Sequence, residues 1–348
     1  MSEEIRGLPD LPALREWLAQ HVEVLGDGVE FELVAQGGSN LTYAVKDAAG
    51  RRVALRRPPV AARIATAHDM SREWRIIEAL HAHPEAGVPV PAAIAYSDDH
   101  DIMGSDFYVM GFADGTILRG PQDAADMNAE QCRTATESLT EVQVAMHTID
   151  ADAAGLGDLG RREGYVERQL KRWLRQFEAV TERELPLVHE LHAKLSKQIP
   201  TQQGVGLCHG DYRFDNTVMG DDFRIRAVLD WELCTLGDPV ADFVWSILYW
   251  SDPEDARDFG SVSPTRHKAF PRRAEVIELY ADRSGFDLSH YDYYEAFSWW
   301  KMACLVEGSA NRLRAGAGGG SSAQGNLNAA LERVTWMLEQ SADAASRF

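Results

Sequence analysis

Residues 207–216 read Leu-Cys-His-Gly-Asp-Tyr-Arg-Phe-Asp-Asn, and this run constrains the chain more than any other stretch. Nineteen positions after Asp211, an apolar segment ends in a second acidic residue, Asp230. An Asp, an Asn five residues later (Asn216) and an Asp that closes a strand can form one site with a base and two oxygen ligands. Magnesium prefers oxygen donors and is usually held by one or two protein groups plus phosphate oxygens. The pattern therefore predicts a Mg²⁺ site at Asn216 and Asp230, beside Asp211.

The segments before this run predict a small antiparallel sheet. Apolar alternation and turn signals indicate strands at 30–35, 41–46, 51–56, 92–97 and 106–112, and helices at 10–21 and 69–82. Later apolar stripes indicate helices at 126–149, 288–310 and 323–342, with two more within 163–198. We expect an α+β chain of two lobes, a sheet-containing lobe over 1–112 and a larger helical lobe over 113–348.

The link between the first two strands reads Gly37-Gly38-Ser39-Asn40. Glycines let the backbone approach an anion and direct N–H groups at it, so this link is a candidate phosphate cover. The same composition is typical of a plain hairpin turn, and it matches neither a P-loop nor a GxGxxG fingerprint. Both interpretations stay open on the sequence alone.

A cation stands at the end of the third strand. Arg56 is placed to reach the phosphates of a nucleotide held under the glycine link, whereas Arg57 belongs to the opposite face of the strand. Glu73, on the following helix, is a candidate partner for Arg56. The alternative interpretation is that Glu73 is a solvated glutamate on the surface of this helix.

Composition excludes several classes of function. The formal net charge of −19 argues against nucleic acid as a partner, because phosphate backbones are bound by basic surfaces. The four cysteines form no CxxC pair, which favours a reducing cytosol over a disulfide framework or a zinc site. The N-terminus lacks the basic and apolar regions of a signal peptide, and no apolar stretch approaches a membrane span, so we expect a cytoplasmic protein without membrane contact.

The order of these features resembles that of kinases. His209-Gly210-Asp211, Asn216 and the run 229–232 (Leu-Asp-Trp-Glu) resemble the aminoglycoside phosphotransferase and choline kinase group. The longer run 229–243 most resembles the branch of kinase-like domains joined to acyl-CoA dehydrogenases. The resemblance covers about residues 25–310, is most specific over 207–243, and implies a protein-kinase-like two-lobed fold.

The resemblance implies use of ATP and Mg²⁺ and transfer to a hydroxyl of a small molecule. Asp211 would be the catalytic base or would align the hydroxyl, and Asn216 and Asp230 would hold the metal. Arg56 would contact phosphates, and Glu73 would steady it. This sequence departs from the family at Arg56, where lysine is frequent, and arginine is not a neutral replacement.

The resemblance also implies roles for neighbouring residues. Backbone groups of 110–112, in particular Met110 and Phe112, would bind adenine, and Gly111 would leave space beside it. Asp242 would anchor the catalytic loop. His209 would be a scaffold residue, and Asp215 lies outside the predicted site.

The acceptor stays open between aminoglycoside-like compounds and hydroxyacyl-type compounds. Candidate lining residues are Trp231, Glu232, Trp300 and Arg312, although core packing is the commoner fate of large aromatics. The alternative function is a nucleotide-binding pseudokinase module without transfer activity. A protein kinase is disfavoured, because no Ala-Pro-Glu element or long activation segment follows Asp230.

Overall fold

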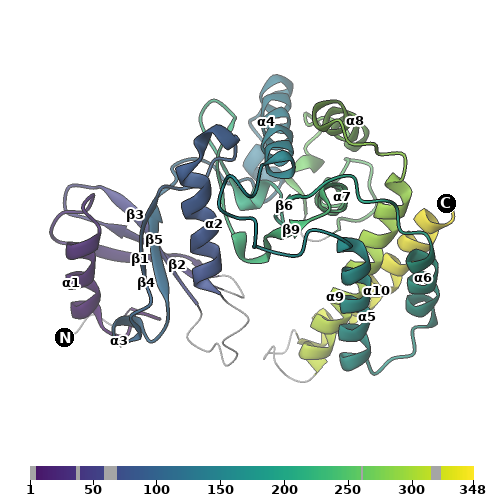
Figure 1. Cartoon of the computed structure of the whole chain (residues 1–348), viewed down its shortest axis with the longest axis horizontal. Helices are drawn as coiled ribbons and strands as arrows, with labels where there is room; N and C mark the ends of the chain where they lie inside the picture. The colour runs from purple at the N-terminus through teal and green to yellow at the C-terminus, as the bar shows by residue number, and fades with distance from the viewer. Residues whose placement is uncertain (1–4, 37–39, 59–68, 260–261, 315–322) are drawn as a thin grey trace.

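The computed structural model describes residues 5–36, 40–58, 69–259, 262–314 and 323–348. Figure 1 shows these segments as two parts, a sheet with flanking helices at the left and a larger, mostly helical part at the right. The predicted α+β class with a small antiparallel sheet is confirmed. The placement of the lobe boundary at residue 112 remains a prediction.

The sheet has five antiparallel strands in the order β1-β2-β3-β5-β4. Their bounds are β1 Glu30–Gln36, β2 Leu41–Lys46, β3 Arg52–Arg57, β4 Ala93–Ser97 and β5 Phe107–Gly111. All five predicted strands are thus present, with ends that differ by at most one residue. The register sets Arg56 opposite Thr42 on β2 and Tyr108 on β5.

The alternation of side chains along these strands determines what each face of the sheet contacts. Odd-numbered residues such as Leu55 and Val109 pack in a core with α1 (Leu11–His21) and α3 (His100–Met103). Even-numbered residues such as Ala54 and Tyr108 join the larger core together with α2 (Met70–Ala82). Arg56 shares the parity of Ala54, so it faces α2 and the second part of the molecule.

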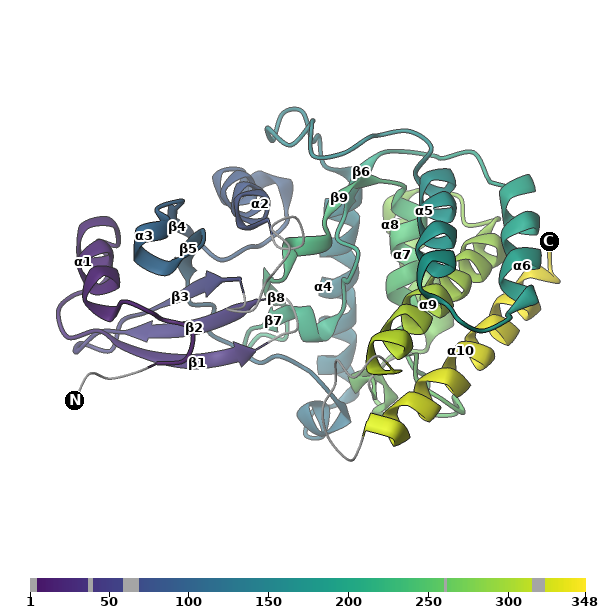
Figure 2. The ribbon, with the colours of Figure 1, turned by 90° about the horizontal axis from the view of Figure 1, so that it is seen from below.

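The second part is built from helices and two short ladders. The helices are α4 Ala129–Thr148, α5 Tyr165–Val180, α6 Pro186–Lys197, α7 Pro239–Ile247, α8 Arg273–Ser284, α9 Tyr291–Arg314 and α10 Ala323–Ala345. The ladders pair β6 Gly206–Cys208 with β9 Thr235–Gly237, and β7 Thr217–Met219 with β8 Ile225–Val228. Figure 2 places β7 and β8 next to the sheet and α6, α9 and α10 far from it.

Short 3₁₀ turns complete the chain at Pro84–Ala86, Pro121–Ala124, Phe214–Asn216, Trp231–Leu233 and Pro264–Arg266. The main helices agree with those predicted from the sequence, whereas α7, α8 and the single turn α3 have no counterpart among the predicted ranges. All four cysteines are buried free thiols. Among the described residues, no helix has the length and apolarity needed to cross a membrane.

Candidate active site

Asp242 holds the loop that follows β6. Its carboxylate accepts hydrogen bonds from the backbone N–H groups of His209 (3.0 Å) and Gly210 (2.9 Å), and from the His147 ring (3.2 Å). Burial alone would raise the pKa of Asp242, but these donors bring the pKa below its ordinary value. Asp242 lies in the first turn of α7, so that helix fixes the two residues before Asp211.

His209 links the two halves of the site. Its fully buried ring donates through Nε2 to the Leu229 carbonyl (2.9 Å), and its Nδ1 accepts the Asp211 N–H (3.3 Å). Both bonds are satisfied by the neutral Nε2–H tautomer. The ring therefore ties the residue before Asp230 to Asp211, which is a scaffolding contact.

Asp211 is surrounded by polar partners from its own loop. Asn216 donates through Nδ2 to the Asp211 carbonyl (2.7 Å) and to its carboxylate (2.8 Å). Arg213 lies 3.2 Å from Asp211 Oδ1 and 2.9 Å from Asp215 Oδ1. Burial raises the pKa of Asp211, and the charge of Arg213 partly offsets that rise. Asp211 is thus a partly desolvated carboxylate beside one cation.

Asp230 adopts a left-handed backbone conformation (φ 65°), which is uncommon outside glycine and is better tolerated by Asp than by most residues. Its carboxylate forms an ion pair with Arg56. Arg56 also donates to Glu73 through Nε (3.2 Å), and Nη2 lies 3.1 Å from the other Glu73 oxygen. Burial alone would lower the pKa of Arg56, but Glu73 and Asp230 raise it above its ordinary value. The guanidinium is therefore a permanent cation.

A cavity of about 380 Å³ lies between the sheet and the segments that carry Asn216 and Asp230. Its lining combines apolar side chains with polar groups that come from both parts of the molecule. The lining residues include Ala54, Ile77, Val218 and Leu229 on the apolar side, and Thr42, Arg56, Asn216 and Asp230 on the polar side. Pockets between two parts of a protein, with few convergent polar groups, are the usual form of a ligand site.

The predicted adenine-binding segment borders this cavity at Met110, Gly111 and Phe112. Gly111 N–H donates to the Ala92 carbonyl (2.8 Å), and a Cβ at Gly111 would lie only 3.3 Å from the Ala92 backbone nitrogen. The glycine therefore allows close approach of Ala92, which the sequence analysis did not foresee. The Phe112 ring lies under the Arg52 guanidinium, 4.4 Å from its centroid.

Of the glycine link, Gly37, Gly38 and Ser39 lie outside the described residues. Asn40 is buried, lines the cavity and donates to the Glu232 carboxylate (3.3 Å). This bond connects the link before β2 with the segment after Asp230. Within the part of the chain that the structure describes, Asn40 Oδ1 has no hydrogen-bond partner.

Two proposed lining residues are core residues instead. Trp231 is fully buried and donates to the Val228 carbonyl (3.1 Å), and Trp300 is fully buried and donates to the Val188 carbonyl (2.9 Å). Their packing requirement explains the difference, as the alternative interpretation anticipated. Arg312 makes a local bond to Ser309 Oγ on α9 (2.8 Å).

Two charged residues of the site, Asp215 and Arg213, lie outside the set predicted from the sequence. Asp215 lines the cavity and pairs with Arg213, which also pairs with Asp211. Burial raises the pKa of Asp215. The alternation of Asp211, Arg213 and Asp215 was a visible signal, since an arginine with an acid two residues to each side forms a compact charge cluster.

Within the described ranges, no group of three or more His, Cys, Asp and Glu side chains is arranged to hold a metal. The oxygen ligands at hand are the Asp230 carboxylate and the Asn216 amide oxygen. Two protein ligands suit Mg²⁺, which keeps waters or phosphate oxygens in its remaining positions. The donor set therefore fits Mg²⁺ bound together with a phosphate compound.

Comparison with known proteins supports this architecture. The model described as the phosphotransferase enzyme family matches residues 30–279. Acyl-CoA dehydrogenase family member 10 of Mus musculus is 31% identical over 307 residues, covering 86% of this chain and 28% of the mouse protein. The chain spans between 28% and 42% of the length of the curated relatives it matches.

Solved structures of related proteins have the same fold as this chain. A Ralstonia eutropha protein described as a candidate aminoglycoside phosphotransferase has a TM-score of 0.82 and 30% identity, covering 97% of this chain and 98% of its own. The aminoglycoside phosphotransferase APH(4)-Ia, solved with AMP-PNP and hygromycin B, has a TM-score of 0.58 and 14% identity. It covers 96% of this chain and 98% of its own, and at this identity it shows the shared fold alone.

Proposed function

Because this chain belongs to the phosphotransferase enzyme family, as its motifs at 207–243 predicted, we propose that it transfers the γ-phosphate of ATP to a hydroxyl of a small molecule. The observation that carries the proposal is that four polar residues meet at one cavity, three in its lining and one bonded to that lining. Asn216 and Asp230 border the cavity, Arg56 extends into its lining from β3, and Asp211 is bonded to Asn216.

The proposed step is a direct displacement at phosphorus. A bond forms between the acceptor oxygen and the γ-phosphorus, and the bond from that phosphorus to the β–γ bridging oxygen breaks, with its electron pair leaving on ADP. The acceptor hydroxyl gives its proton to the Asp211 carboxylate. A weak base suffices, because the transition state of phosphoryl transfer is loose and most of the catalysis is positioning and charge stabilisation.

Asn216 is suited to a double role. Its amide nitrogen is used by the two bonds to Asp211, which leaves the amide oxygen as the atom that would hold Mg²⁺ with Asp230. Mg²⁺ bound there would neutralise charge on the transferring phosphate. The same Asn216 contact would fix the Asp211 carboxylate relative to the metal.

Arg56 would replace the family's frequent lysine as the phosphate-binding cation. The Glu73 carboxylate engages two guanidinium nitrogens of Arg56, so its position on the sheet is fixed. Guanidinium binds phosphate in a planar bidentate manner, which lysine cannot do. We expect Met110 and Phe112 to place backbone groups against adenine on the other side of the cavity.

The alternative is a nucleotide-binding module without transfer activity. It is favoured by the ion pair between Arg56 and Asp230, since Asp230 must release or share that cation to hold a metal. The presence of Asp211, Asn216 and Asp230 together argues against it, because binding alone does not need a base. Aminoglycoside-like and hydroxyacyl-type acceptors both fit the reaction chemistry.

Incubation with labelled ATP, Mg²⁺ and a panel of hydroxyl compounds tests the proposal, with Asp211→Asn as the matched variant. Transfer that disappears in Asp211→Asn supports the phosphotransferase. Nucleotide binding with neither transfer nor Asp211-dependent ATP hydrolysis would support the module instead.

A further inference from the structure

One face of α7 continues from the loop anchor towards α9. Asp242, Trp245 and Tyr249 follow at spacings of three and four residues, so they share this face although Tyr249 lies just beyond the end of the helix. Asp242 holds the loop amides before Asp211, and the Arg213 guanidinium lies 4.5 Å from the Tyr249 ring centroid. Trp245 therefore lies between two residues that contact the catalytic loop.

Trp245 presents a buried hydrogen-bond donor that lacks an acceptor among the described residues, and Lys301 places a cation beside it. The Trp245 indole is 5% exposed, and its Nε1–H has no hydrogen-bond partner among the residues that the structure describes. Lys301 comes from α9, and its ammonium lies 3.8 Å from the Trp245 ring centroid. Over the ranges that the structure describes, no carboxylate lies within ion-pair distance of Lys301. An unpaired buried donor is costly, so the Trp245 N–H next to this cation indicates an acceptor that is supplied from outside the chain.

Two further observations, on Ser298 and on Lys301, also indicate an acceptor from outside the chain. Ser298 lies three residues before Lys301 on the same face of α9, and its buried hydroxyl also lacks a partner. Burial lowers the pKa of Lys301 to about 8, because water no longer stabilises the charge fully. An anion bound beside the ammonium would reverse that loss.

The rings around Trp245 form a chain of edge contacts. Phe259 contacts Trp245 (5.8 Å between centroids), Tyr249 (4.7 Å) and Trp299 (4.9 Å), and Trp299 contacts Trp336 (5.0 Å). Aromatic faces attract cations. Here the protein's own cations occupy them, with Lys301 over Trp245, Arg213 over Tyr249 and, at 5.9 Å, Arg257 over Trp336. A cationic acceptor would meet occupied rings and like charge.

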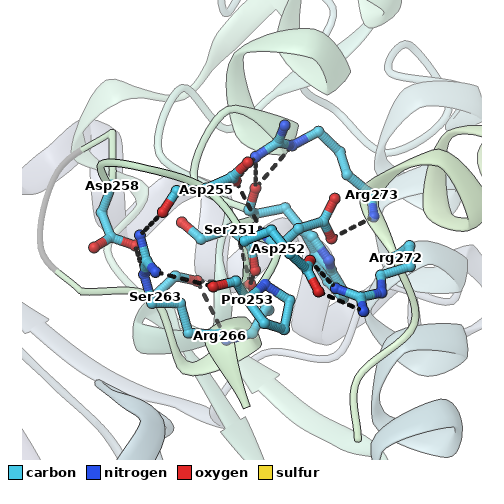
Figure 3. A network of polar contacts seen from close by, with 12 residues as sticks. Ser251, Asp252, Pro253, Asp255, Asp258, Ser263, Arg266, Arg272 and Arg273 are labelled. Carbon is cyan, nitrogen blue, oxygen red and sulfur yellow. Dashed lines mark hydrogen bonds and ion pairs between the residues drawn. The ribbon is translucent and has the colours of Figure 1, made fainter. Parts of the chain in front are cut away.

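The segment that carries Phe259 is fixed by the polar network of Figure 3. Arg266 donates to the Asp258 carboxylate (2.8 Å) and to the Asp255 carbonyl (2.7 Å). Arg273 donates to the Trp250 carbonyl (2.8 Å) and pairs with Asp255. These bonds hold the segment to Trp250 and to the start of α8, so Phe259 is preorganised beside Trp245.

We propose that Trp245 and Lys301 form an oxyanion subsite of the acceptor site, and that the acceptor is a hydroxylated compound carrying a carboxylate or a phosphate. This inference rests on the proposed phosphotransferase function. The acceptor's oxyanion accepts hydrogen bonds from the Trp245 indole N–H and the Lys301 ammonium, while the acceptor's hydroxyl faces Asp211. Of the two acceptor classes left open, polycationic aminoglycoside-like compounds are disfavoured.

Binding is tested directly on the indole N–H signal of Trp245 by ¹⁵N NMR of the full chain, with the signal identified by its loss in Trp245→Phe. We expect acetate, inorganic phosphate or both to shift it saturably, and acetamide, the neutral match of acetate, to leave it unchanged. A shift caused by acetate indicates an acceptor with a carboxylate, and a shift caused by inorganic phosphate indicates an acceptor with a phosphate. Lys301→Met should abolish the response and Lys301→Arg should retain it. Lys194→Met is the matched control, because the Lys194 ammonium lies over the Phe348 ring instead of the Trp245 ring.

Absence of a saturable shift, an equal response to acetamide, or an unchanged response in Lys301→Met overturns the subsite. Transfer assays separate this inference from the proposed function. They compare acceptors with three carbon atoms each: glycerate and glycerol 3-phosphate are anionic, glycerol is neutral and serinol is cationic. Asp211-dependent transfer that favours serinol overturns the anionic acceptor and leaves the phosphotransferase standing. Transfer to an anionic acceptor whose KM rises about tenfold or more in Lys301→Met, with kcat little changed, supports both.

Discussion

Arg56 and Asp230 form an ion pair although 174 positions separate them in the chain. Glu73 binds the same guanidinium, so one cation joins β3, α2 and the segment after β8. This arrangement makes the resting site a three-residue charge cluster across the two parts of the molecule.

We expect Arg56→Met to lower the free energy of unfolding by about 3–5 kcal/mol, because Glu73 is left as a buried, unpaired carboxylate. Arg56→Lys should lose less, since it keeps the charge. Urea denaturation followed by tryptophan fluorescence measures both. Arg162→Met, which breaks an exposed pair with Asp152, is the control and should change stability by less than about 1 kcal/mol. A loss in Arg56→Met no larger than in the control would contradict the buried-pair account.

Gly206 packs directly on the α4 backbone. A Cβ at this position would lie 2.5 Å from the His147 carbonyl oxygen and 2.6 Å from its Cα, which no rotamer change can relieve. We expect Gly206→Ala to destabilise the protein by about 3 kcal/mol, because overpacking forces backbone shifts. It should also weaken activity, since His147 bonds to Asp242.

Gly308→Ala in α9 is the matched control, because its Cβ would have its nearest neighbour at 3.9 Å. Removing a helix glycine should stabilise the protein by about 0.5–1 kcal/mol. Thermal unfolding of Gly206→Ala and Gly308→Ala measures the two changes in stability. Equal behaviour of the two alanines would show that close packing at Gly206 is unimportant.

Local patterns predicted much of the fold and of the catalytic loop. Alternation located the five strands, and the parity of β3 placed Arg56 and Arg57 on opposite faces, as found. The short spacing between Asp211 and Asn216 made their contact predictable within one loop. The helix α8 was missed because Arg273–Ser284 is short, and Val276 and Tyr280, the two side chains that it buries, mark only one narrow stripe.

Contacts between distant segments were beyond sequence reasoning. Nothing local relates Trp245 to Lys301, since only the packing of α7 on α9 brings them together. The contact of Gly111 with Ala92 was not predicted for the same reason, because Ala92 approaches it from the segment just before β4. Trp231 and Trp300 were ambiguous because an aromatic side chain looks the same in sequence whether it fills a core or lines a site.

Asp230→Asn should remove the Mg²⁺ dependence of nucleotide binding. Loss of one charged ligand corresponds to about 1.5–3 kcal/mol, or roughly 10–100-fold in affinity. Calorimetric titration with AMP-PNP, in Mg²⁺ and in a chelator, measures the two affinities. Asp222→Asn, on the turn between β7 and β8, is the control and should keep the wild-type ratio. If Asp230→Asn keeps that ratio as well, Asp230 does not hold the metal.

We expect the charge of Arg213 to determine the pH at which kcat/KM falls on the acid side. The proposed reaction needs Asp211 as a carboxylate, so kcat/KM rises as pH increases through the pKa of Asp211 and levels off above it. Burial raises that pKa above the ordinary value of 3.8, and Arg213 holds it down. Arg213→Met removes the cation, so the acid limb should move to higher pH, and Arg213→Lys should move it less. Arg162→Met should leave it in place. A limb that stays fixed or moves to lower pH in Arg213→Met would show that Asp211 is not the titrating group.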